Sequence, residues 1–97
     1  RVETERTTPR DFRLNQNFPN PFNARTTITY TLPHAAVVDL RIHDLNGREI
    51  EVLLDGKNQA AGEHSLAIDT TQWPSTIYFY TLRSGSWSET RKMVMIK

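Results

Sequence analysis

The chain has 97 residues, no cysteine and a nearly even charge, with 12 Lys and Arg against 11 Asp and Glu. This length suffices for one domain with a modest core, and the lack of cysteine excludes disulfides and thiol chemistry within the chain. The balanced charge gives no reason to expect nucleic acid as a partner, and no apolar run approaches the roughly 18 residues of a transmembrane segment.

Residues 1–11, RVETERTTPRD, contain a single apolar side chain, Val2, and show no periodicity. Such a composition is typical of a segment with little structure of its own. We therefore expect residues 1–11 to be a linker or tail from an upstream domain, and residues 12–97 to form the folded unit.

Alternating apolar and polar residues then predict a series of short strands. The first begins at Thr26 and ends at Pro33, and the second covers VVDLRIHD. Alternation also predicts strands over residues 48–55 and 64–69. Residues 77–82 are apolar or aromatic on both faces, which is typical of a central strand covered on both sides or of a row of tyrosines on a half-exposed face. A last strand is expected over residues 87–97, after a turn at Ser84 and Gly85. Residues 55–62, DGKNQAAG, have the composition of a turn, and no stretch longer than a turn has the helical period.

The pattern fixes an expected hairpin register between the second and third of these strands. A two-residue Asn-Gly turn would set Ile42 opposite Glu51, whereas a three-residue loop over residues 45–47 sets Ile42 opposite Ile50. The second choice keeps the apolar residues on one face, so it is favoured, with Gly47 at positive φ. It also predicts the pairs Leu40–Val52, Val38–Leu54, Arg41–Glu51 and Asp44–Arg48.

Short strands with turn signals every eight to twelve residues favour an all-β fold. We predict an immunoglobulin-like antiparallel β-sandwich of about seven short strands. A small barrel is the alternative.

The stretch NQNFPNPFN, residues 15–23, combines turn-forming asparagine and proline with two phenylalanines. Each proline keeps the preceding residue out of the helical region, so the segment is expected to be stiff and extended. The PxxP spacing of a polyproline ligand is absent. We expect a rigid corner at one end of the sandwich, with Phe18 and Phe22 both folded under the sheets.

Motifs for catalysis and for metal binding are weak. His34, His43 and His64 are not spaced as metal ligands and are expected to be surface residues, and Asp39 and Asp44 are explained by a hairpin. The DLNG and LLDGKN stretches have too few oxygen ligands for a calcium loop. We predict a binding or structural module that is not an enzyme and uses no cofactor.

Several segments resemble one known family. The opening LNQNFPNPFNARTTITYTLP, the strands and turn of VVDLRIHDLNGREIEVLLDG, and the last strand TRKMVMIK are similar to the C-terminal sorting domains of the type IX secretion system. The resemblance covers residues 12–97. One departure is Thr76, which stands where the family usually has a glycine before the aromatic strand.

This resemblance implies a role as a secretion signal. Such a domain follows a cargo, is read in the periplasm by translocon components, and directs the cargo to the cell surface or the medium. A sortase-like protease at the surface commonly removes it. The positions that carry the family's motifs, and are the candidate recognition residues, are Asn17, Phe18, Pro19, Asn20, Pro21, Phe22, Asn23, Gly47, Arg48, Glu49, Lys92, Met93, Val94, Met95, Ile96 and Lys97.

Two other functions are consistent with the sequence. The immunoglobulin-like domain of flagellar hook-capping proteins carries a similar NPFN block and would give a structural role. A carbohydrate-binding module is suggested by Trp73, Trp87, Tyr78 and Tyr80, and would need these rings to be exposed and coplanar. For the secretion signal, the last strand is also predicted to lie at a sheet edge, where unpaired backbone would let a partner add a strand.

Overall fold

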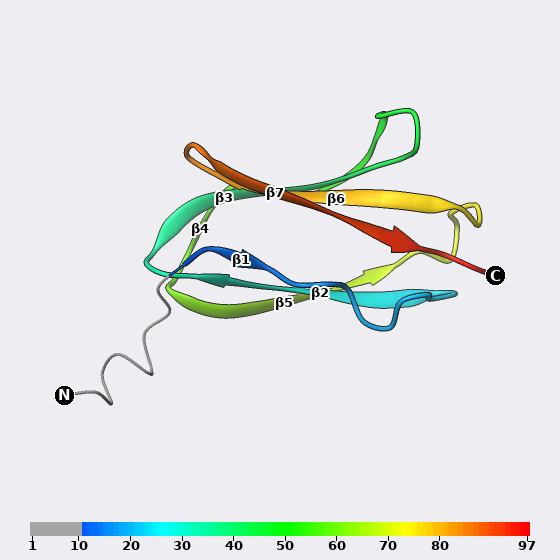
Figure 1. The fold of residues 1–97 in the computed structure, drawn as a ribbon, viewed down its shortest axis with the longest axis horizontal. Helices are drawn as coiled ribbons and strands as arrows, with labels where there is room; N and C mark the ends of the chain where they lie inside the picture. The colour runs from blue at the N-terminus through cyan, green and yellow to red at the C-terminus, as the bar shows by residue number, and fades with distance from the viewer. Residues whose placement is uncertain (1–10) are drawn as a thin grey trace.

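A computed structural model describes residues 11–97, so most of the predicted linker lies outside the described residues. The described chain forms two antiparallel sheets stacked as a sandwich, which confirms the predicted all-β fold (Figure 1). One sheet has the order β1-β2-β5 and the other β4-β3-β6-β7. The strands are β1 (Arg13–Leu14), β2 (Arg25–Leu32), β3 (Ala36–His43), β4 (Glu49–Gln59), β5 (Gly62–Asp69), β6 (Ile77–Ser84) and β7 (Trp87–Val94).

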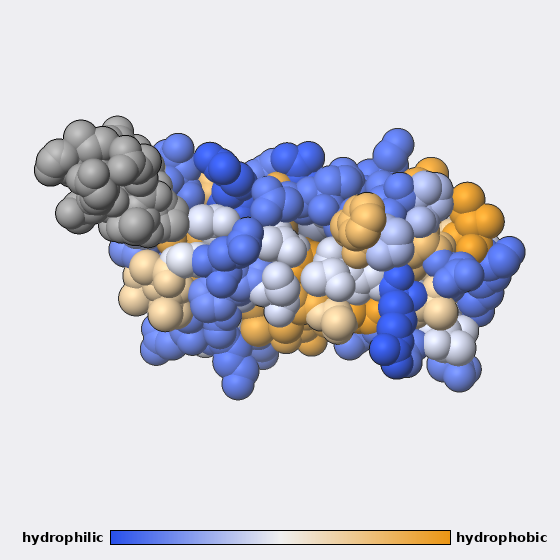
Figure 2. All heavy atoms as spheres, turned by 90° about the horizontal axis from the view of Figure 1, so that it is seen from below, coloured by the Kyte–Doolittle hydropathy of each residue, from blue (hydrophilic) through white to orange (hydrophobic). Residues whose placement is uncertain are grey.

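The core lies between the two sheets and follows the alternation of the sequence. In β2, Ile28, Tyr30 and Leu32 are buried, while the threonines between them face outward. The outer face of the three-stranded sheet is accordingly mostly hydrophilic, as Figure 2 shows. Burial of alternate apolar side chains on two facing sheets is the main source of stability in a domain without disulfides. The buried apolar residues are Leu14, Phe22, Ile28, Tyr30, Leu32, Val38, Leu40, Ile42, Leu54, Ile68, Tyr78, Tyr80, Leu82, Met93 and Met95.

One long side of the sandwich is closed by contacts between β1 and β7. The Arg91 Nε donates to the Leu14 carbonyl at 2.6 Å, and the Tyr80 hydroxyl donates to the Asn15 carbonyl at 2.6 Å. Burial raises the pKa of Tyr80 to about 12, so the hydroxyl stays protonated as a donor. The two-residue strand β1, which is too short to show a period, is thereby fixed to both sheets.

The hairpin between β3 and β4 begins as predicted and then departs from the predicted register. Gly47 has φ of 80°, the Asp44 N–H donates to the Arg48 carbonyl at 2.9 Å, and His43 pairs with Glu49. These contacts confirm the three-residue loop. Beyond it the ladder shifts three times, so that Ile42 faces Glu51, Arg41 faces Val52, Leu40 faces Leu54, and Val38 faces Lys57. The continuous pairing Ile42–Ile50, Leu40–Val52 and Val38–Leu54 is therefore wrong, because β-bulges add residues to β4.

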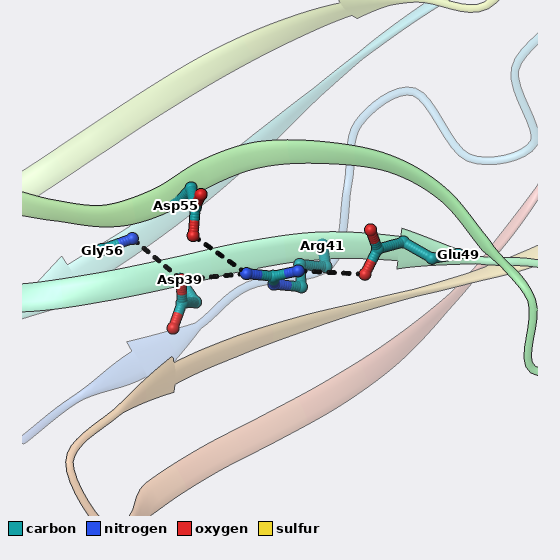
Figure 3. Close-up of polar contacts among 5 residues, drawn as sticks. All are labelled: Asp39, Arg41, Glu49, Asp55 and Gly56. Atoms are coloured by element: carbon teal, nitrogen blue, oxygen red, sulfur yellow. Dashed lines mark hydrogen bonds and ion pairs between the residues drawn. The ribbon is translucent and has the colours of Figure 1, made fainter.

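Arg41 and Asp39 hold the bulged strand in place (Figure 3). The Arg41 guanidinium contacts Glu49 and Asp55, each at 3.0 Å, rather than the predicted Glu51. The Asp39 carboxylate accepts the N–H of Gly56 at 2.8 Å, where the backbone takes φ of 63°. Gly56 thus allows β4 to continue to Gln59, so the turn predicted over residues 55–62 is confined to Ala60 and Ala61.

The loops divide between two ends of the sandwich. At one end lie the segment before β2, the β3–β4 hairpin, the loop before β6 and the last residues of the chain (Figure 1). We call this the C-terminal end. At the opposite end Phe12 stacks on Trp87, with ring centroids 5.0 Å apart. The described chain therefore begins at one end and finishes at the other.

Candidate recognition site at the C-terminal end of the sandwich

The segment from Asn17 to Asn23 forms a fixed corner. Asn17 is buried, and its amide donates to the Pro19 carbonyl at 3.2 Å and to the Thr26 hydroxyl at 2.9 Å. The Thr26 hydroxyl in turn donates to the Pro19 carbonyl at 2.9 Å. Both peptide bonds that precede Pro19 and Pro21 are cis. The predicted corner is confirmed, with Asn17 as its internal hydrogen-bonding centre, but the backbone bends at residues 19–21 and 23–24 instead of running extended as predicted.

The two phenylalanines of this corner have opposite environments. Phe22 is only 3% exposed and belongs to the core, as predicted. Phe18 is 79% exposed, so the prediction that it folds under the sheets is wrong. The reason is its backbone pairing: Phe18 forms an isolated bridge with Thr27, whose side chain lies on the outer face of β2. Side chains of directly paired residues share a face of the sheet, so Phe18 points to solvent.

This corner covers the outer edge of the end of β7. The Phe22 N–H donates to the Val94 carbonyl at 3.0 Å, and the Ile96 N–H donates to the Phe22 carbonyl at 2.7 Å. The Val94 N–H donates to the Asn20 side chain at 2.8 Å, and the Gln16 amide donates to the Lys92 carbonyl at 2.7 Å. Residues near the start and the finish of the described chain therefore form one hydrogen-bonded unit.

These contacts correct the prediction for the terminal strand. β7 does lie at the edge of its sheet, but the backbone of residues 92–96 is not open to a partner. The Lys92 and Val94 carbonyls and the Val94 and Ile96 N–H groups are already bonded to the corner, which acts as a short parallel strand beside it. Strand addition at this position would first require the corner to leave.

The last six residues divide between core and surface. Met93 and Met95 are fully buried, and Val94 is half-buried. Lys92 is exposed, and Ile96 is 56% exposed. Lys97 is anchored, because its ammonium donates to the Thr71 carbonyl and its N–H to the Ser75 hydroxyl, both at 2.8 Å.

Two shallow recesses flank the joined segments. One, of about 360 Å³, is lined by Pro19, Pro21, Phe22, Asn23 and Ile96. The other, of about 370 Å³, is lined by Asn23, Ala24, Thr71 and Lys97. Figure 2 shows hydrophobic atoms exposed at this end of the molecule, as well as along the middle of the visible face. Exposed apolar side chains beside rigid prolines are suited to protein recognition, because binding orders little that is not already ordered.

The third motif, residues 47–49, lies in the hairpin at the same end. One Asp44 carboxylate oxygen accepts the N–H groups of Asn46 and Arg48, both at 2.9 Å, and the other accepts Arg48 Nε at 3.1 Å. These bonds, led by the Arg48 N–H, hold the pKa of Asp44 below its usual range. Asp44 thus positions Gly47 and Arg48, as its predicted pairing with Arg48 indicated.

The lowered pKa of Asp44 makes the hairpin sensitive to acid. Because the unfolded state takes up this proton first, the stabilisation is present above the ordinary aspartate pKa of about 3.9 and is lost as pH falls through the lower folded value. We expect Asp44→Ala to lower the thermal midpoint at about pH 7, and to change it less at a pH well below the ordinary aspartate pKa of about 3.9. Melts followed by circular dichroism at both pH values test this, and an equal effect at both would contradict it.

Thr76 connects the hairpin to the terminal segment. Its carbonyl accepts the Met95 N–H at 3.0 Å, and it lines a recess of about 290 Å³ together with Asp44, Leu45, Asn46, Arg48, Ile50, Pro74 and Tyr78. Within residues 11–97 only glycines take a positive φ, so Thr76 is not strained by replacing the family's usual glycine. All three predicted motifs therefore meet at one end of the sandwich.

A family model described as "Secretion system C-terminal sorting domain" matches residues 16–97. The chain belongs to this family. It is a sorting domain of type IX secretion, which indicates export toward the cell surface or the extracellular space. Membership also indicates two partners, an upstream cargo and the type IX secretion machinery. Comparisons with curated proteins and with solved structures found no match.

The aromatic residues of the sorting domain do not form a carbohydrate platform. Tyr78 and Tyr80 are buried. Trp73 packs on Tyr78 at a tilt of 52°, and Trp87 stacks on Phe12 at the opposite end of the sandwich. Exposed coplanar rings, the feature that would favour carbohydrate binding, are thus not made by these four residues.

Two kinds of feature are absent from residues 11–97 of the sorting domain. No three of its histidine and carboxylate side chains gather as metal ligands would, and it has no helix long and apolar enough to cross a membrane. Sequence reasoning placed Gln16 in the corner but missed its contact with the last strand, and it missed Thr26 as a member of the corner. Gln16 stands directly before the motif, but its bond to Lys92 joins residues 76 apart and leaves no local signal.

Proposed function

We propose that the C-terminal end of the sandwich is the surface by which the type IX machinery recognises this sorting domain. The observation that carries the proposal is the hydrogen-bonded joining of residues 16–22 to residues 92–96. Each motif alone is a short loop or strand end. Joined, they present Phe18, Ile96 and the proline-walled recess on one rigid support, which only the folded domain displays.

In this proposal the domain is a signal and a substrate, without catalytic activity of its own. It is attached behind a cargo, is read in the periplasm, and accompanies the cargo across the outer membrane to the cell surface or the medium. A sortase-like protease then cleaves before Phe12. The position of Phe12 supports this division, because it lies at the end of the sandwich opposite the recognition surface. Cargo and protease would therefore approach one end while the translocon holds the other.

The test is an export assay with the 97-residue chain fused behind a periplasm-targeted reporter, in a host with type IX secretion. The intact fusion should reach the surface or the medium. Phe18→Ala combined with Ile96→Ala should leave the reporter in the periplasm, because both side chains are exposed and their loss removes contacts with a partner only. Exposed residues of this kind change stability by roughly 0.5 kcal/mol or less.

Val37→Ala is the matched control, since Val37 is 52% exposed but lies at the start of β3, at the opposite end. It should be exported normally. Normal export of the Phe18/Ile96 variant would show that recognition uses another surface. Retention of the intact fusion, in a host that exports its native cargo, would count against the sorting role itself.

A further inference from the structure

A second surface on this domain, along β5, has no role in the site described above. In an antiparallel ladder the backbone groups of alternate residues point to opposite edges of a strand. The Thr70 N–H donates to the Ala24 carbonyl at 2.8 Å, and the register continues through Thr26–Ile68 and Ile28–Leu66. The even-numbered residues of β5 therefore bond to β2, and the odd-numbered residues face the other way.

The odd-numbered edge of β5 is open. Glu63, Ser65, Ala67 and Asp69 are all exposed, and within residues 11–97 their backbone N–H and C=O groups have no hydrogen-bond partner. The pairing of β5 with β2 is regular over all eight residues, with no bulge to twist the edge away. The other edges differ from this one: β1 has two residues, β4 is bulged, and residues 92–96 at the end of β7 are covered by the corner.

The sandwich also lacks a strand at this position. The contacts of β1 with β7 place those strands on one long side, so β5 and β4 share the other. The three-stranded sheet therefore faces a four-stranded sheet, and no strand of the smaller sheet lies fully across from β4. The apolar side chains of β4 on the inner face are covered incompletely, since Ile50 and Leu53 pack against the core but are only half-buried. A strand added beside β5 would lie across from these residues and complete the second sheet.

We propose that the β5 edge accepts an extended strand from a partner protein. The expected strand has apolar residues on its inner face and basic residues six positions apart on its outer face, opposite Glu63 and Asp69. β5 itself carries no Lys or Arg. Asp69 already faces Arg25 across the ladder, so Glu63 supplies the larger part of the charge preference.

The same carboxylates disfavour a second copy of this chain as the occupant. In the antiparallel self-pairing that uses the whole edge, Glu63 of each copy would stand opposite Asp69 of the other. Like charges directly opposite each other in a sheet are destabilising. This proposal rests on the open edge of β5, its carboxylates and the incomplete cover of β4, and it is independent of the recognition surface at the C-terminal end.

The test uses the 97-residue chain and a synthetic peptide, Lys-Val-Thr-Ile-Thr-Val-Lys, whose lysines would face Asp69 and Glu63. Amide hydrogen exchange followed by NMR should slow at residues 63, 65, 67 and 69 on binding, while residues 64, 66 and 68 are already protected. The same peptide with glutamate at both ends should bind roughly tenfold more weakly, since both cross-strand charge pairs become repulsive.

A charge-reversal variant tests the predicted charge preference without disturbing the fold. Glu63→Lys changes an exposed side chain, and this variant should prefer a peptide whose last residue is glutamate instead of lysine. The proposal is overturned if the lysine peptide at millimolar concentration leaves exchange at the odd residues unchanged, or if Glu63→Lys keeps the original preference. If amide protection at the odd-numbered residues of β5 rises with protein concentration in the absence of peptide, the proposal is overturned in favour of a second copy of the chain.

Discussion

Phe22→Ala should destabilise the domain by about 3–5 kcal/mol, because it removes a large side chain from a well-packed core. Phe22 is 3% exposed and belongs to the core cluster, and its backbone holds the Val94 carbonyl and the Ile96 N–H. Such a loss is a large part of a total stability of about 5–15 kcal/mol. A urea melt followed by the fluorescence of Trp73 and Trp87 measures it.

The matched control is Phe18→Ala, four residues earlier in the same motif. This residue is 79% exposed, so its replacement should change the free energy of unfolding by about 0.5 kcal/mol or less. Comparison of the two variants thus separates the phenylalanine that stabilises the fold from the phenylalanine that is exposed at the surface. Equal midpoints for the two variants would contradict the assigned burial. In the export assay, Phe18→Ala should impair secretion although the domain remains folded, so its effect on secretion is not a consequence of lost stability.

The contrast between these two residues shows where sequence reasoning ends. Both are phenylalanines beside proline in a loop, and composition gives each the same preference for burial. Their difference arises from pairing partners far along the chain, Thr27 for Phe18 and Met95 for Phe22. No local pattern records such pairing, so the rigid corner was predictable and the exposure of Phe18 was not.

The strands show the same division. Alternation predicted β2, β3 and β5, each of which has a buried face with period two. The strand β6 was predicted from residues that are apolar or aromatic on both faces, and β7 from its place after a turn. Alternation also predicted a strand over residues 48–55, where β4 lies, but not the register or the length of β4, because bulges break the period and Gly56 continues the strand through a stretch with turn composition. The meeting of the three motifs at one end was accessible only through the family resemblance and the structure.

Removal of Lys92–Lys97 is expected to unfold the domain, and this limits what a truncation can reveal about recognition. The deletion takes away Met93 and Met95, which are fully buried. The loss of each buried methionine costs about 2–5 kcal/mol, so that together they approach the whole stability of a small domain. The corner would also lose its partner, because Phe22, Asn20 and Gln16 all bond to the deleted backbone.

Circular dichroism of the truncated chain should therefore show no cooperative thermal transition at 25 °C or above, whereas Lys92→Glu combined with Lys97→Glu should melt cooperatively. That double variant keeps both methionines and the backbone of β7, although it loses the Lys97 bond to Thr71. A truncated chain that melts like the intact one would show that these residues are not structural. If it instead fails to fold, as we expect, its failure to be exported says nothing about which residues the translocon contacts. The contacts are then identified by surface variants alone, because Phe18, Ile96 and the lysines can be changed while the joined segments that support them stay intact.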